Sequence, residues 1–111
     1  MNSQGEFLVI LSTTDQLDAA NRIAEALIND HLAACVQVEG PIRSFYRWEG
    51  KIESAKEFRL VIKTTRPREQ DVFQRIRDLH GYETPQILSI PVTGGHGDYL
   101  DWVRTEVDGA S

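Results

Sequence analysis

The sequence has little cysteine and no long apolar run. Cys35 is the single cysteine among 111 residues, so the chain can form no disulfide within itself, which fits a reducing compartment. No stretch approaches the roughly 18 apolar residues that a membrane-spanning helix needs. The first residues also carry no basic region leading into an apolar one. These absences predict a cytoplasmic protein without a membrane partner.

Positive charge is also scarce. Lysine and arginine total 12 against 17 aspartate and glutamate residues, which gives a formal net charge of −5. No basic block stands free of acidic residues, so nucleic acid is not expected as a main partner. Apolar residues make up 41% and charged residues 26% of the chain, values typical of a globular protein. We therefore predict a single domain over residues 1–111, long enough to bury its own core.

Local metal-binding and catalytic motifs are missing as well. The sequence has no Cys-x-x-Cys, His-x-His or His-Glu-x-x-His pattern. Any metal site must therefore be assembled across strands or across subunits. No recognisable set of nucleophile, base and oxyanion donors is present either, so we predict a protein that is not an enzyme.

Regular strand and helix patterns begin near the N-terminus. Residues Phe7–Ser12 form a short continuous apolar run, which is typical of a buried strand. Apolar residues then repeat at helical spacing from Leu17 to about Asp30. Thr13 and Gln16 match a capping box at the start of this helix.

The middle of the chain predicts two long strands joined by a tight turn. Residues Ala33–Trp48 and Lys51–Thr64 alternate apolar and polar side chains and are rich in β-branched and aromatic residues. The Glu-Gly pair between them indicates a hairpin. Gly40 and Pro41 interrupt the first strand, and proline cannot donate to a ladder, so we expect an edge position, a bulge or a sharp bend there.

The last third of the chain completes the pattern. Pro67 suits the first turn of a second helix that runs to about Leu79. Residues 86–92 return to strand character, with Pro91 indicating an edge strand, and Asp98 is an expected N-cap for a final helix. The order β-α-β-β-α-β predicts an α+β, ferredoxin-like fold, with an antiparallel sheet, two helices on one face and a C-terminal helix.

The two middle strands are longer than this fold requires. An average strand has about five or six residues, and both predicted strands far exceed that length. Such strands would overhang a four-stranded sheet and leave backbone groups unpaired at its edges. We therefore expect the chain to form an oligomer.

The segment HGYETPQI, which begins at His80, collects several reactive side chains between the second helix and the last strand. A histidine suits the negative end of a helix, and Gly81 suits the left-handed position that follows one. Pro85 favours extended geometry before the strand. This interpretation explains the glycine and the proline, but it leaves His80, Tyr82 and Glu83 as candidates for a binding site.

Three further residues each have two interpretations. Cys35, at the start of a strand, is either a small buried apolar residue or a soft ligand for copper. Lys63, at a strand end, either extends its charge to solvent or binds an anion near the start of the second helix. Trp48, in an aromatic stretch, is either a core or subunit contact or part of a stacking platform.

Several motifs occur in an order that resembles one known family. The pieces are LAACVQVEGPIRSFYRWEGKI (Leu32 to Ile52), KT (Lys63-Thr64), HGYETPQI (His80 to Ile87) and YLDWV (Tyr99 to Val103). They resemble the CutA family of divalent-cation tolerance proteins from Phe7 to Val107. Gly81 departs from the proline that is common in the family, and Gln86 departs from a frequent glutamate, which removes a carboxylate ligand.

The resemblance implies a ferredoxin-like subunit in a homotrimer, similar to PII signalling proteins. It also implies a link to tolerance of copper and other divalent cations, and copper binding is ascribed to the family. By position it implies a pocket whose members are Cys35, Lys63, His80, Tyr82 and Glu83, with Trp48 nearby or across the subunit interface. Of these, Cys35 and His80 suit copper, and Glu83 either completes the site or orients the imidazole.

Two functional hypotheses follow from the resemblance. The first is a homotrimeric divalent-cation tolerance protein that binds copper or another divalent metal ion through Cys35, His80 and Glu83 and acts in the response to metal ions. The alternative is a PII-like binding module that holds a small metabolite or anion in clefts between subunits, using Lys63, His80 and Glu83. No other cofactor is implied.

Overall fold

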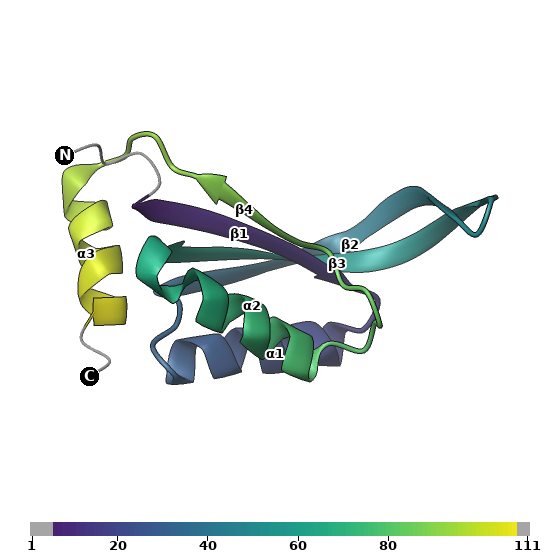
Figure 1. Cartoon of the computed structure of the whole chain (residues 1–111), viewed down its shortest axis with the longest axis horizontal. Coiled ribbons are helices and arrows are strands. Elements are labelled where there is room, and N and C mark those ends of the chain that lie inside the picture. Colours follow the sequence, from purple (N-terminus) through teal and green to yellow (C-terminus); the bar gives the residue numbers. More distant parts are fainter. Residues whose placement is uncertain (1–5, 109–111) are drawn as a thin grey trace.

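The structure, a computed structural model, describes residues 6–108 of the chain. Strands and helices follow one another in the predicted order (Figure 1). The elements are β1 (Phe7–Thr14), α1 (Leu17–Asn29), β2 (Cys35–Trp48), β3 (Lys51–Thr65), α2 (Glu69–Leu79), β4 (Ile87–Pro91) and α3 (Gly97–Asp108), with a 3-10 turn at Arg66–Arg68 before α2.

The four strands form one antiparallel sheet in the order β2-β3-β1-β4. Figure 1 shows α1 and α2 side by side on one face of this sheet, with α3 at its end. The edge strands β2 and β4 hold Pro41 and Pro91, as expected for residues that cannot donate to a ladder. The predicted α+β, ferredoxin-like fold is confirmed.

The hydrophobic core lies between the sheet and the two helices. Alternate side chains of β1 and β3 face the helices, and Leu8, Ile10, Leu60 and Ile62 are fully buried there. They form one cluster with the apolar positions of the helices, which are Ala20, Ile23, Leu27, Val72 and Ile76. Each fully buried aliphatic side chain of this kind contributes about 1.5–3 kcal/mol to folding. The helical spacing of these residues therefore fixes which side of each helix meets the sheet.

The other face of the sheet carries a second apolar set, which we call the open face: Val9, Leu11, Val61, Leu88 and Ile90. Opposed residues of a ladder share a face, and the register pairs Val9 with Ile90 and Leu11 with both Val61 and Leu88. All five are half-buried or exposed in the described chain, and Leu88 is 54% exposed. The sheet therefore has an apolar surface that α1 and α2 do not cover.

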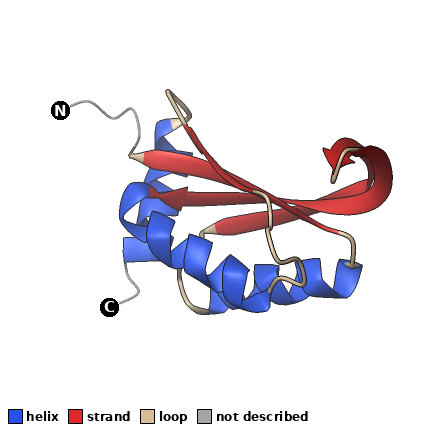
Figure 2. Cartoon of the chain, turned by 45° about the vertical axis from the view of Figure 1, so that its right-hand side comes forward, coloured by secondary structure: helices blue, strands red, loops and turns tan. Residues whose placement is uncertain are grey.

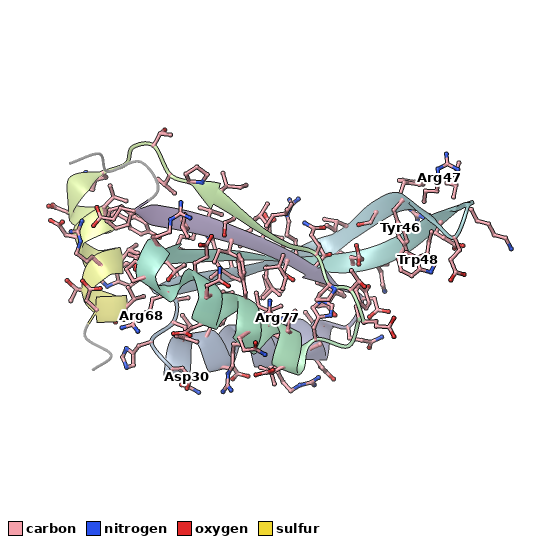
Figure 3. All side chains as sticks on the ribbon, in the orientation of Figure 1. Asp30, Tyr46, Arg47, Trp48, Arg68 and Arg77 are labelled. Atoms are coloured by element: carbon pink, nitrogen blue, oxygen red, sulfur yellow. The ribbon has the colours of Figure 1, made fainter. Side chains whose placement is uncertain are left out.

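The C-terminal helix α3 is held to one end of the sheet through the carbonyls of its last turn. The Nε of Arg68 donates to the carbonyl oxygen of Val107 at 3.1 Å, and Nδ1 of His31 lies 3.0 Å from the carbonyl oxygen of Glu106. Because a carbonyl only accepts, His31 donates from Nδ1. Figure 3 shows Arg68 beside the end of α3. Both contacts satisfy carbonyls that have no partner within a helix.

Beyond the sheet, β2 and β3 continue as a two-stranded arm in which residues 42–48 pair with residues 51–57. A bulge between Glu39 and Ile42 separates this arm from the sheet, and Figure 2 shows the arm curling away beyond it. The bulge confirms the irregularity expected at Gly40 and Pro41, since an extra residue in one strand bends that strand. The arm is the overhang that the strand lengths predicted.

Two predictions about helix starts are wrong. β1 continues through Thr14, so Thr13 belongs to the strand, and α1 begins after Gln16 without a side-chain cap. Pairing of Thr13 with β3 thus outweighs its preference for a helix cap. Asp98 lies in the first turn of α3, which begins at Gly97, rather than before the helix.

The left-handed glycine predicted at the end of α2 is also wrong. Gly81 has no positive φ, and the helix ends because His80 is already extended, with φ −81° and ψ 145°. A left-handed residue does end α1, but it is His31, with φ 57°. The amide of Leu32 donates to the carbonyl of Leu27 at 2.9 Å there, the pattern of a Schellman motif.

Gly40 allows β2 to bend at the bulge, and its replacement is the first testable prediction. Its φ is +145°, and a Cβ there would lie 2.7 Å from Cδ1 of Phe58 and 3.0 Å from the carbonyl oxygen of Glu57. We expect Gly40→Ala to lower the free energy of unfolding by about 1–3 kcal/mol because of backbone strain and this overlap.

Gly94→Ala is the matched control, because a Cβ at Gly94 would meet nothing within 4 Å. We expect it to change the free energy of unfolding by less than about 0.5 kcal/mol. Urea denaturation at one protein concentration measures both variants. Equal stability of the two variants would contradict the role assigned to Gly40.

Candidate functional site

His80 fixes the loop between α2 and β4 with both nitrogens of its ring. Nε2 lies 2.6 Å from the carbonyl oxygen of Thr13, and Nδ1 lies 3.0 Å from the backbone nitrogen of Tyr82. Because the carbonyl only accepts and the amide only donates, Nε2 carries the proton and Nδ1 accepts. The ring therefore has no free lone pair in this structure. Its visible role is to tie the loop to the end of β1.

Tyr82, held by this contact, reaches a buried carboxylate on the arm. Its hydroxyl donates to Oε2 of Glu57 at 2.8 Å, and Glu57 is only 6% exposed. The ring of Tyr82 also contacts that of His80, with centroids 4.7 Å apart and ring planes tilted by 55°. Burial raises the pKa of Tyr82 well above its ordinary range, and the hydrogen bond with Glu57 and the charge of that residue raise the pKa further. Tyr82 thus stays protonated and serves as a donor.

A cavity of about 590 Å³ lies beside this pair and extends along the arm as far as Trp48. We call it the arm pocket. Its lining residues are Thr13, Ser44, Phe45, Tyr46, Trp48, Glu57, Tyr82, Glu83, Thr84 and Gln86. The charged members are both carboxylates, and most of the aromatic members come from β2. The arm pocket is therefore acidic and aromatic.

The arm supplies one wall of this pocket. Ser44, Tyr46 and Trp48 alternate along β2 and so share a face. Figure 3 shows Tyr46 and Trp48 on the arm, beyond the ends of the helices. Of the residues that the sequence singled out, the structure thus brings together Trp48, Tyr82 and Glu83, with His80 behind them holding the loop.

Cys35 and Lys63 lie at a different place. They oppose each other on β2 and β3, and Lys63 in turn opposes Val9 of β1. The carbonyl that His80 contacts belongs to Thr13, four residues further along β1. At about 3.3 Å per residue, this is an offset of about 13 Å along the strands. A single chain therefore does not bring Cys35 to His80.

The surroundings of these two residues also differ from the expectation. Lys63 donates from Nζ to Oε1 of Gln37 at 2.6 Å in an exposed contact, so the one partner that the structure gives it is a neutral amide, and the anion contact weighed from the sequence stays a prediction. Lys63 borders a smaller cavity of about 250 Å³ under α3, which Tyr99 also lines. Desolvation raises the pKa of Tyr99, and the interaction with Cys35 raises it further. Cys35 thus neighbours a phenol rather than an imidazole.

The described part of the chain forms no complete metal site. Among residues 6–108, no three His, Cys, Asp or Glu side chains lie together so that they could hold a metal ion. The set Cys35, His80 and Glu83 therefore does not assemble in one chain. That these residues bind a metal ion stays a prediction.

Sequence reasoning missed Glu57, the buried acid of the arm pocket. Its hydrogen-bonding partner Tyr82 lies 25 residues away in the sequence, and no local sequence pattern indicates that the two side chains meet. The alternation along β3 gave one usable signal, because Glu57 follows the exposed Lys56 and comes directly before the apolar alternation that starts at Phe58. The long strands and an irregularity at Gly40 and Pro41 were expected, but the direction in which the arm bends, toward the loop after α2, was not.

Comparison with known proteins identifies the class to which this fold and site belong. The family model described as CutA1 divalent ion tolerance protein matches residues 8–106. The divalent-cation tolerance protein CutA of Archaeoglobus fulgidus is 41% identical over 99 residues, which cover 89% of this chain and 96% of that protein. The crystal structure of CutA from Xylella fastidiosa has a TM-score of 0.91 at 37% identity and covers 93% of this chain and 99% of that chain.

A further solved structure is described as the periplasmic divalent cation tolerance protein CutA from Archaeoglobus fulgidus. It has a TM-score of 0.88 at 40% identity and covers 91% of this chain and 98% of that chain. Fold and comparisons together define a ferredoxin-like protein of the divalent-cation tolerance class. The chain belongs to the CutA family, as the sequence motifs indicated. Within residues 6–108, no helix has the length and apolar character needed to cross a membrane.

The contact between Tyr82 and Glu57 gives the second prediction. Tyr82→Phe removes the hydroxyl and leaves a buried carboxylate without this hydrogen bond, so we expect the free energy of unfolding to fall by about 1–3 kcal/mol. Tyr46→Phe is the matched control, because Tyr46 lines the same pocket but is substantially exposed. Urea denaturation of both variants measures the difference, and equal losses would show that the Tyr82 hydroxyl has no special role.

Proposed function

We propose that this chain acts in divalent-cation tolerance as a homotrimer that binds copper or another divalent ion with ligands from more than one subunit. Membership of the CutA family supports the tolerance role, because the relatives are described in those terms. The observation that carries the assembly is the open face of the sheet. We propose no catalysed reaction, since tolerance of cations rather than a reaction defines the family.

Two apolar surfaces support association between copies of the chain. The first is the open face, where Leu88 and Ile90 are exposed, and the second is the arm, where Phe45, Trp48 and Ile52 are exposed. Extended apolar surface on a small chain is typical of a protein contact. The edge strands β2 and β4 also present backbone groups that another copy can pair. In a closed ring every copy buries the same surface against a neighbour, so no copy is left with that surface uncovered.

A charged residue on the open face tests this assembly. Burying an unpaired carboxylate in a subunit contact is costly, so we expect Leu88→Glu to give monomers at micromolar concentration. Leu17→Glu is the matched control, because Leu17 is 46% exposed but lies on α1, away from the open face. Light scattering measures the mass of each variant, and circular dichroism checks that each is folded. A trimer of folded Leu88→Glu would exclude the open face from the interface.

The metal site is proposed to be completed between subunits. The soft sulfur of Cys35 suits copper, and the carboxylate of Glu83, which lines the arm pocket, supplies a second ligand. His80 joins such a site only by releasing the carbonyl of Thr13 or the amide of Tyr82. A shared site agrees with the distance between Cys35 and His80 in one chain.

Copper titration by calorimetry tests this site. We expect Cys35→Ser and Glu83→Gln each to weaken binding of Cu(I) or Cu(II) by about tenfold or more. His80→Ala shows whether the imidazole rearranges to join the ligands. The control is His96→Ala, because the side chain of His96 is 79% exposed beside Asp98. Unchanged affinity in both Cys35→Ser and Glu83→Gln would contradict the metal site.

A second candidate is a PII-like module that holds a small molecule. The arm pocket favours it, since about 590 Å³ exceeds what a metal ion needs. The anion considered from the sequence is not favoured, because the charged lining residues are carboxylates and Lys63 lies elsewhere. Any small molecule held there is therefore expected to be neutral or cationic.

A cytoplasmic location is proposed from the lone cysteine, which needs no oxidising compartment. The relative from Archaeoglobus fulgidus is described as periplasmic, so the cellular location of this chain does not follow from its family. Cell fractionation with compartment markers tests the proposal. Recovery of the chain outside the cytoplasmic fraction would overturn it.

A further inference from the structure

The arm pocket and the open face lie on one continuous face of the sheet. Side chains an even number of residues apart along a strand share a face. On β1 the pocket residue Thr13 lies two residues beyond Leu11 of the open face. On β3 the pocket residue Glu57 lies four residues before Val61, and the bulge adds its extra residue to β2 alone. A copy that covers the open face therefore also reaches the arm pocket.

This continuous face is negative at the end formed by the arm pocket. The charged lining residues are Glu57 and Glu83, and no Lys, Arg or His lines the pocket. Glu57 is buried and accepts from the hydroxyl of Tyr82. Glu83 is exposed, and among residues 6–108 it forms no ion pair. The pocket end thus offers a carboxylate to a cation that comes from outside the chain.

The same face is positive at its other end, where Lys63 lies. Lys63 is six residues from Glu57 on β3, which shares the face and places the two about 20 Å apart. Its ammonium donates to the neutral amide of Gln37 and forms no ion pair within residues 6–108. Arg59, between the two ends, is already paired with Glu39 at 2.7 Å. A single chain therefore carries opposite charges at two ends that it cannot bring together.

We propose that the arm pocket of one copy receives the Lys63 end of the open face of the next copy, with the ammonium of Lys63 paired with the carboxylate of Glu83. Copies placed head to tail pair opposite charges, whereas contact between two pocket ends would place carboxylate against carboxylate. A head-to-tail contact repeats around a ring, so each of three copies uses both of its ends. This inference deepens the proposed homotrimer, and it rests on that homotrimer.

The proposed contact also bears on the metal site. Cys35 opposes Lys63 across the ladder of β2 and β3, so the two side chains share a face. Docking of the Lys63 end therefore carries the thiol of one copy toward the Glu83 of its neighbour. These are the two ligands that the proposed metal site draws from different copies.

Charge reversal at each end tests the contact. Sedimentation equilibrium in EDTA measures the association constant, so that no metal ion contributes. We expect Lys63→Glu and Glu83→Lys each to weaken trimer formation about tenfold or more, because each places like charges in every contact. Combined in one chain, the two changes restore opposite charges and are expected to return the association constant to within about threefold of that of the unmodified chain.

Arg22→Glu is the matched control, because Arg22 is exposed on α1, on the face of the sheet opposite the open face. It makes the same change of charge as Lys63→Glu. We expect it to leave association within about twofold, as an isolated exposed charge contributes little, and not to restore association in Glu83→Lys. Circular dichroism checks that every variant is folded.

Carbodiimide coupling of the unmodified chain is a second measurement that needs no substitution. The carbodiimide activates a carboxylate, which forms an amide with an ammonium in contact and releases the reagent as a urea. Isotope-labelled and unlabelled chains are mixed and equilibrated before coupling. We expect mass spectrometry to find a peptide that joins Lys63 to Glu83, with one half labelled and the other unlabelled.

Two results would overturn this inference and leave the homotrimer standing. The first is a trimeric chain in which Lys63→Glu restores Glu83→Lys no better than Arg22→Glu does. The second is a trimeric chain that yields no peptide joining Lys63 of one copy to Glu83 of another. An unmodified chain that stays monomeric would overturn the homotrimer and this contact together.

Discussion

Alternation along the strands is the constraint on which the rest of this structure depends. Successive side chains of a strand point to opposite faces, and β1 is apolar on both of its faces. One set meets α1 and α2 and forms the core. The other set includes Leu11 and, through the ladder, Leu88 and Val61. Because α1 and α2 both pack on one face of the sheet, the other apolar face stays uncovered in a single chain.

The arm extends the same constraint to the site. β2 and β3 continue past the sheet because their pairing persists to the hairpin, and the bulge at Gly40 turns them out of its plane. This turn brings Tyr46 and Trp48 to the loop that His80 fixes. Glu57, buried where arm and sheet meet, becomes the acceptor for Tyr82. The pocket is thus a consequence of strand length and one bend, combined with a loop tied to the end of β1.

Local patterns in the sequence predict much of this fold but little of the site's geometry. The alternation in β2 and β3, the hairpin between them and the irregularity at Gly40 were all correct, because each depends on neighbouring residues. The capping box at Thr13 failed because strand pairing outweighs a local cap. The contact between Glu57 and Tyr82 was not predicted, because it depends on how the arm bends. The separation of Cys35 from His80 likewise depends on register, which is a property of the whole sheet.

We propose above all that neighbouring copies of the chain cover the open face and complete the metal site. Sedimentation equilibrium of the unmodified chain at micromolar concentration tests it most directly. The account predicts a single species with three times the chain mass of 12.6 kDa. A single species at the mass of one chain would contradict it, because the open face would then lie in water and no ligand could be shared between subunits.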